Sequence, residues 1–227
     1  MKIKEIFADS YYLVVDKPAG ILSVQAGKKK EPSLEDLLGL RAVHRLDRDT
    51  SGILVLAKSD AALEALQAEF KARRVVKEYL ALAWGYVPSR GRIESPLLRR
   101  HNRRNQFRVS GGEKARFALT EFHRRKEISF KNNKFSLLEV KIHTGRTHQI
   151  RVHLSSIKHP VVGDKDYGLG KKEKEVFSKP IKRHFLHAFK LEFHHPLSGE
   201  KISLVSELPS DLQSLLDRME DISRKPM

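Results

Sequence analysis

Short runs of alternating apolar and polar residues recur along the chain, and this period of two is typical of half-buried β-strands. In residues 136–143, Leu138, Val140 and Ile142 alternate with polar residues, which predicts a strand with one packed face and one solvated face. Residues 53–57 are instead continuously apolar, which predicts a strand buried on both faces. With turn residues as boundaries, strands are expected at residues 12–15, 53–57, 77–84, 106–109, 116–122, 136–143, 185–193 and 201–205.

Helical periodicity is limited to a few stretches. In residues 61–74 the apolar positions have helical spacing, and Ser59 precedes them as a candidate N-cap. Two further helices are expected over residues 147–157 and 212–219. Because strands predominate in consecutive runs and helices lie at the flanks, the sequence predicts an α+β fold with a mixed, largely antiparallel sheet core. No long glycine-, serine- or proline-rich linker divides the chain, so we expect a single domain over residues 1–227.

The composition excludes several kinds of chemistry. The chain has 227 residues, of which 40% are hydrophobic, and this is enough to fill a sizeable core. It contains no cysteine, so disulfides, thiolate nucleophiles and cysteine-ligated zinc or iron–sulfur sites are excluded. No apolar run approaches the ~18 residues of a membrane span, and the N-terminal stretch lacks the apolar segment of a signal peptide. We therefore expect a cytoplasmic protein with no membrane partner.

The net charge points to a polyanionic partner. Forty-four lysines and arginines against twenty-eight aspartates and glutamates leave a formal charge of +16. The basic residues are dense in residues 92–126, whereas acidic residues gather near the C-terminus. A one-sided distribution favours a surface that follows nucleic-acid phosphates over uniform solubilisation. A generally basic chain without such a partner is the alternative.

The segment VHRLDRDTSGILVLAK, residues 43–58, places opposite charges at the start of the buried strand. Arg45 and Arg48 flank Asp47, and we expect them to keep this carboxylate charged. A charged carboxylate anchored beside a core strand is costly unless it is paired, and such sites are often functional. An ion pair that only pins a loop is the alternative, and the local chemistry favours neither.

A second candidate segment is HTGRTHQIRVHL, residues 143–154. Arg146 lies where a strand ends and a helix is expected to begin, a position whose exposed N–H groups favour anions. His148 and Arg151 are three residues apart and share a helix face, from which Arg151 can reach a carboxylate on a neighbouring loop. A basic face turned to solvent is the alternative. The histidines of this segment do not have metal-ligand spacing, so no metal site is expected.

Taken together, the segments resemble the RluA-type pseudouridine synthases. The resemblance is carried by five motifs in the family's order: HRLDRDTSGILVLAKS, KEYLA, TGRTHQIRVHL, HPVVGDKDYG and RHFLHA. It extends from about residue 12 to about residue 205. It implies the pseudouridine synthase fold and an isomerase that converts uridine in RNA to pseudouridine.

The resemblance also implies roles for individual residues. Asp47 matches the family's catalytic aspartate, and Arg45 matches the arginine that takes the place of the flipped uridine. Tyr79 matches the tyrosine that packs on uracil and is a candidate acceptor of the C5 proton. Arg151 matches the basic residue that pairs with the aspartate, and Leu186 matches an apolar residue of the base pocket. Addition to the ring, attack at C1′ and removal of the 2′ proton all remain open as routes.

Partners and cofactors follow from the same resemblance. Pseudouridylation is an internal rearrangement, so no cofactor or metal is expected, and the target base has to leave its stack. No room is left for the N-terminal S4-like domain that the family often carries, so RNA binding rests on the catalytic domain, which we expect to be a monomer. Ribosomal and transfer RNA are both candidate substrates. Binding is expected from basic and polar residues of the two segments described above, namely Arg99, Arg100, Arg103, Arg104, Arg146 and His148.

Two other functions use the same residues. A degenerate synthase would hold or remodel RNA without chemistry, although it would have no chemical need to keep Asp47, Tyr79 and Arg151 together. A nucleoside glycosylase could use the same carboxylate near C1′ and release free uracil.

Overall fold

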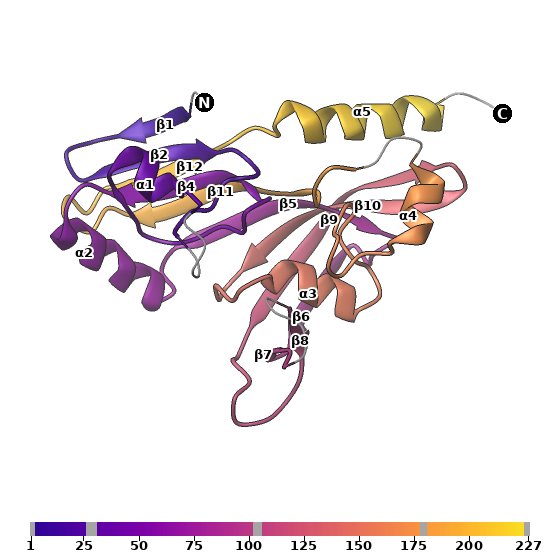
Figure 1. Cartoon of the computed structure of the whole chain (residues 1–227), viewed down its shortest axis with the longest axis horizontal. Coiled ribbons are helices and arrows are strands. Elements are labelled where there is room, and N and C mark those ends of the chain that lie inside the picture. The colour runs from indigo at the N-terminus through magenta and orange to yellow at the C-terminus, as the bar shows by residue number, and fades with distance from the viewer. Residues whose placement is uncertain (1–2, 26–30, 102–105, 178–180, 225–227) are drawn as a thin grey trace. The chain divides into compact units, whose positions relative to one another are not determined.

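The computed structural model describes residues 3–25, 31–101, 106–177 and 181–224 (Figure 1). The chain folds into two compact units. The first unit comprises Met1–Glu78 and His187–Leu208, and the second comprises Tyr79–Leu186 and Pro209–Met227. The single domain expected from the sequence stays a prediction.

The first unit contains a mixed sheet. Its strands follow the order β1-β2-β4-β11, with β12 paired to β11 and β3 paired to β4. The β4–β11 pair is parallel, whereas the other pairs are antiparallel. The strands are β1 (Lys4–Ala8), β2 (Tyr12–Lys17), β3 (Arg41–Ala42), β4 (Ser51–Ala57), β11 (Leu186–His194) and β12 (Lys201–Val205).

The parallel pair depends on a glycine at the start of β4. Gly52 has φ +114°, and a Cβ at this position would lie 2.2 Å from the carbonyl oxygen of Ala188 on β11. Only a residue without a side chain adopts this backbone angle and tolerates this approach. β4 therefore includes Gly52 and begins at Ser51, two residues before the start expected from the apolar run.

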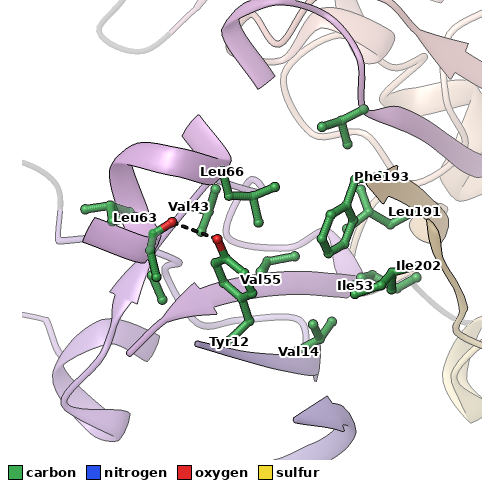
Figure 2. Packing of buried hydrophobic residues seen from close by; sticks show 13 residues of the cluster. Tyr12, Val14, Val43, Ile53, Val55, Leu63, Leu66, Leu191, Phe193 and Ile202 are labelled. Atoms are coloured by element: carbon green, nitrogen blue, oxygen red, sulfur yellow. Dashed lines mark hydrogen bonds between the residues drawn. The ribbon is translucent and has the colours of Figure 1, made fainter. Parts of the chain in front are cut away.

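The core of the first unit packs β4 against helix α2 (Asp60–Lys71) (Figure 2). All seven residues of β4 are buried, as the continuous apolar run predicted. Ser59 caps α2 by accepting a hydrogen bond from the backbone N–H of Ala62, which confirms the expected N-cap. The Tyr12 hydroxyl donates to the Ala62 carbonyl oxygen at 2.9 Å. The short helix α1 (Leu34–Leu38) precedes β3.

The second unit has a sheet in the order β5-β10-β9-β6 and a separate hairpin of β7 and β8. Helix α5 packs against β9 through one buried apolar face (Figure 1). The elements are β5 (Val76–Trp84), β6 (Arg90–Glu94), β7 (Leu97–Arg99), β8 (Phe107–Val109), β9 (Leu119–Phe130), β10 (Asn133–Ile142), α3 (Gln149–Ser156), α4 (Lys171–Val176) and α5 (Ser210–Arg224).

The α+β fold with a mixed, mostly antiparallel sheet is confirmed, and several boundaries differ from expectation. The largest difference is at the end of β9, which runs to Phe130 instead of residue 122, and β10 begins at Asn133 instead of residue 136. The strand expected from residue 116 begins at Leu119, because Arg116 exchanges two backbone hydrogen bonds with Leu97 instead of joining the ladder of β9. Helix α3 begins at Gln149 because His148 has a left-handed backbone with φ +56°.

Several short elements were not expected from the sequence: β1, β3, β6, β7, α1 and α4. They have two to six residues each, too few for either periodicity to become apparent.

No helix in the described ranges is long and apolar enough to cross a membrane.

His44 makes the stability of the first unit depend on pH. Its ring stacks on Phe70 at 4.9 Å between centroids, and its Nε2 accepts the backbone N–H of Val55. Burial, with the Lys77 ammonium as a smaller cause, lowers the pKa of His44 to about 3. Because the unfolded chain binds a proton near pH 6.5 and the folded chain does not, this residue costs stability as the pH falls below about 6.5.

We expect the free energy of unfolding to fall between pH 6.5 and pH 5 with a slope from His44 alone that steepens from about 0.7 to about 1.4 kcal/mol per pH unit. His44→Gln should flatten this slope, and the exposed His123→Gln should leave it as in the wild type. Urea denaturation at several pH values measures both. Equal slopes in the wild type and in His44→Gln would show that His44 titrates normally in the fold.

Candidate active site

Asp47 lies in the segment that connects β3 to β4, and backbone hydrogen bonds fix this segment. The backbone N–H of Leu46 donates to Ser23 Oγ at 3.0 Å, and the same hydroxyl donates to the Leu46 carbonyl oxygen at 3.1 Å. The backbone N–H of Thr50 donates to the Asp47 carbonyl oxygen at 3.1 Å. The half-buried Asp47 is therefore held by the main chain on both sides.

The strongest of these restraints is the side chain of Lys17, which is completely buried at the end of β2. Its ammonium donates to the carbonyl oxygens of Pro18 at 2.9 Å, Ile21 at 2.8 Å and Arg48 at 2.9 Å. The backbone N–H of Gly20 donates to the same Arg48 oxygen at 2.9 Å. An ammonium has three donors, and these three bonds tie residues 18–21 to the residue that follows Asp47.

The two arginines beside Asp47 have different surroundings. Arg48 forms an ion pair with Glu31, a partner that the sequence did not indicate. Arg45 is exposed, and its side chain makes no hydrogen bond or ion pair with any residue that the structure describes. Arg45 is thus accessible to a ligand, as the role implied by the resemblance requires.

A buried histidine fixes the start of β4. His187 Nε2 lies 3.0 Å from the Ser206 carbonyl oxygen, and its Nδ1 lies 2.9 Å from Ser51 Oγ. Because a carbonyl only accepts, Nε2 carries a proton and donates it to Ser206. Through Nδ1 the ring also bonds to Ser51, so it links the main chain at Ser206 to the residue before Gly52.

In the second unit, Arg151 on α3 is buried and forms a bidentate ion pair. Its Nε and Nη2 donate to the two carboxylate oxygens of Asp164, each at 2.7 Å, and Nη2 also donates to Asp166 Oδ2 at 2.7 Å. Asp164 Oδ1 also accepts the backbone N–H groups of Asp166 and Tyr167. The expectation that Arg151 reaches a carboxylate on a neighbouring loop is confirmed, and that carboxylate belongs to the HPVVGDKDYG motif.

Tyr167 connects Arg151 to the β7–β8 hairpin. The centroid of its ring lies 5.1 Å from the guanidinium carbon of Arg151. Its hydroxyl accepts the Phe107 backbone N–H at 2.8 Å and lies 3.0 Å from His148 Nδ1. Burial raises the pKa of Tyr167 to about 12, so the hydroxyl keeps its proton. Sequence reasoning missed Asp164, Asp166 and Tyr167, although all three lie within one quoted motif.

Arg146 is placed by its neighbour Gln149. The buried amide of Gln149 donates to the Leu119 carbonyl oxygen and to Thr120 Oγ1, and it accepts the backbone N–H of Arg146 at 3.0 Å. The Arg146 side chain donates from Nε to the Phe117 carbonyl oxygen at 3.0 Å. One of the N–H groups expected to favour an anion, that of Arg146, is therefore already bonded, and the rest of its guanidinium remains to bind one.

The remaining candidates are distributed over the second unit. Tyr79 and Leu186 are buried, with 7% and 4% of their surfaces exposed. Arg99 ends β7 and Arg100 follows it, and both are exposed. Arg103 and Arg104 lie outside the described residues. The pairing of Arg151 with Asp47 that the resemblance implies stays a prediction.

Comparisons with known proteins agree on one family. Residues 11–156 match the sequence profile described as RNA pseudouridylate synthase. Ribosomal large subunit pseudouridine synthase D of Zymomonas mobilis is 36% identical over 97% of this chain and 73% of its own length. Ribosomal large subunit pseudouridine synthase C of Buchnera aphidicola is 34% identical over 94% of this chain and 70% of its own length. The structure of human RNA pseudouridylate synthase domain containing 1 covers 96% of this chain with a TM-score of 0.76 and 29% identity.

We expect Lys17→Met to destabilise the segment around Asp47, because three carbonyl oxygens lose a buried donor and each loss costs ~1–3 kcal/mol. Backbone N–H groups of Gly20, Leu46 and Thr50 should exchange with deuterium faster, and the free energy of unfolding should fall by about 3 kcal/mol or more. The exposed Lys58→Met should cost less than ~1 kcal/mol. Unchanged exchange in Lys17→Met would rule out the proposed restraint.

We expect Arg151→Met to cost about 3–5 kcal/mol of stability, because the side chain of Asp164 has no exposed surface and loses its buried partner. Urea denaturation measures this loss. Adding Asp164→Asn should restore part of it, since an amide is neutral and its oxygen still accepts the N–H groups of Asp166 and Tyr167. An additive loss in the double variant would mean that the pair is not coupled.

Proposed function

Since this chain belongs to the RNA pseudouridylate synthase family, we propose that Asp47 is the carboxylate with which it converts specific uridines to pseudouridine. The chain is an RNA pseudouridine synthase, an isomerase of uridine in RNA. The observation that supports the choice of Asp47 is the restraint of its segment. Main-chain groups of Leu46, Asp47 and Arg48 all form hydrogen bonds, and these restrict the position of the Asp47 carboxylate.

The reaction has no net gain or loss of atoms or electrons. The bond between N1 and C1′ breaks, the uracil turns, and a bond forms between C5 and C1′, while C5 loses one proton and N1 gains one. A carboxylate beside C1′ stabilises the positive charge that develops when the glycosidic bond breaks, and this charge stabilisation is a large term in enzyme catalysis. A carboxylate that the fold already holds in place pays no reorganisation cost during this step.

Roles for the other matched residues belong to the same proposal. Tyr79 packs on the uracil and accepts the C5 proton, and Leu186 lines the base pocket. Arg45 enters the space that the flipped uridine leaves in the RNA. Its side chain is exposed and bonds to none of the residues that the structure describes, which supports this role. Arg151 is proposed to pair with Asp47, as the resemblance implies, and its bidentate pair with Asp164 supports a fixed orientation.

The substrate is proposed to be structured RNA, and the names of the relatives favour ribosomal over transfer RNA. A formal charge of +16 supports binding through many phosphate contacts. We further propose that the protein acts as a monomer in the cytoplasm and without a cofactor.

We expect Asp47→Asn to lower pseudouridine formation by several orders of magnitude, because loss of a catalytic nucleophile has an effect of this size. RNA affinity should stay within a few-fold, since it rests on many other groups. Mapping of pseudouridines in total RNA from cells with and without the protein identifies the substrate. The activity of each variant is then measured on that RNA. Asp60→Asn is the matched control. It should keep full activity, because the side chain of Asp60 is 80% exposed.

Three outcomes separate the alternatives in this assay. Pseudouridine in an unbroken chain supports the isomerase, free uracil indicates a glycosylase, and neither product indicates a binding protein. Turnover of Asp47→Asn above roughly a thousandth of the wild-type rate would show that Asp47 is not the catalytic carboxylate.

A further inference from the structure

The second unit contains a basic pocket of about 780 Å³ that the proposed catalytic roles do not use. No aspartate or glutamate is among its described lining residues. Its cationic lining residues come from the β7–β8 hairpin, the segment before β9 and the turn before α3: Arg99, Arg100, Lys114, Arg116 and Arg146.

Three of the described lining residues are apolar and one of these is aromatic, and we call them the apolar floor. They are Leu97 and Leu98 on β7 and Phe107 on β8. The Phe107 ring meets the His148 ring edge-to-face at 5.9 Å, and its backbone N–H is held by the Tyr167 hydroxyl. Phe107 is half-buried, so part of a positioned aromatic ring remains accessible from the pocket.

Three of the cations have no anionic partner among the residues that the structure describes. Lys114 and Arg116 are exposed, and within those residues neither side chain forms an ion pair or a hydrogen bond. Over the same residues the Arg146 side chain bonds through Nε alone, to a carbonyl oxygen. Like charges gathered around a pocket repel one another, so an anion bound there relieves the repulsion.

We propose that this pocket binds one unpaired nucleotide of the substrate RNA, other than the uridine that is isomerised. The base stacks on Phe107, and the flanking phosphates bind Lys114, Arg116 and Arg146. This inference rests on the proposed RNA substrate. The pocket is then a second nucleotide site, separate from the site of the reaction. Breakage of the glycosidic bond is proposed to depend on a carboxylate, and the described lining of the pocket contains none.

The shape and lining favour an unpaired nucleotide over a duplex. A volume of about 780 Å³ lies within the range of ~300–1,000 Å³ typical of small-molecule sites. A-form RNA presents phosphates and hydroxyls and keeps its base faces stacked inside, so it would leave the apolar floor unused. Aromatic rings and arginines around a groove are instead the features that bind splayed-out bases with little sequence preference.

The test uses Asp47→Asn as the background, so that binding is measured without turnover. The probes are an RNA hairpin with an unpaired loop, the same hairpin with single abasic loop positions, and a fully paired RNA of equal length. We expect Phe107→Ala to weaken hairpin binding about tenfold and duplex binding much less. One abasic position should weaken binding to the background protein and remove the effect of Phe107→Ala.

The phosphate contacts are tested with two exposed residues whose replacement leaves the fold intact. Lys114→Ala with Arg116→Ala should lower the slope of log affinity against log salt by about 1.4, since each single-strand phosphate contact contributes ~0.7. The matched control is Lys4→Ala with Lys158→Ala, both exposed and outside the pocket, and it should leave the slope unchanged.

The outcomes separate this proposal from the proposed function. Equal losses for hairpin and duplex in Phe107→Ala, or an unchanged salt slope in the Lys114/Arg116 variant, would overturn the nucleotide pocket even if the wild type forms pseudouridine. A Phe107 effect confined to unpaired RNA would support the pocket even if the wild type forms none, and only the catalytic proposal would then fail.

Discussion

The buried ammonium of Lys17 is the interaction on which the placement of Asp47 depends. A charge with no exposed surface is tolerated only when hydrogen bonds replace its hydration, and here three carbonyl oxygens do so. Those carbonyls lie in two segments, one that follows β2 and one between β3 and β4, so satisfying the ammonium also fixes both segments. The hydrogen bonds that offset the cost of burying this charge therefore also restrain the segment that carries the proposed catalytic carboxylate.

The second unit uses the same principle with the opposite sign. Asp164 has no exposed side-chain surface and is satisfied by Arg151 and by two backbone N–H groups. Tyr167 follows in the same turn, lies against the Arg151 guanidinium, and bonds to Phe107 and His148. One buried carboxylate therefore orders both a matched arginine and the aromatic ring of the basic pocket.

The positive charge of the chain is thus put to two different uses. Lys17 and Arg151 are buried and paired, where they hold backbone and side chains in place. Lys114 and Arg116 are exposed around an apolar floor, where they meet no carboxylate of the described protein. A net charge alone does not distinguish a structural cation from one available to RNA. Burial does, because a buried cation requires its partners within the fold.

The sequence by itself determined the fold class, the family and the candidate residues. The apolar run of β4, the alternation in β10 and the Ser59 cap depend on neighbours in the chain, so local pattern was enough to predict them. Only the tertiary structure decided which groups meet. Lys17 and Arg48 are thirty-one residues apart, and the Tyr167 and Phe107 partners are sixty apart. Such pairs have no periodicity along the chain, because they form only when packing brings distant segments together to satisfy buried polar groups.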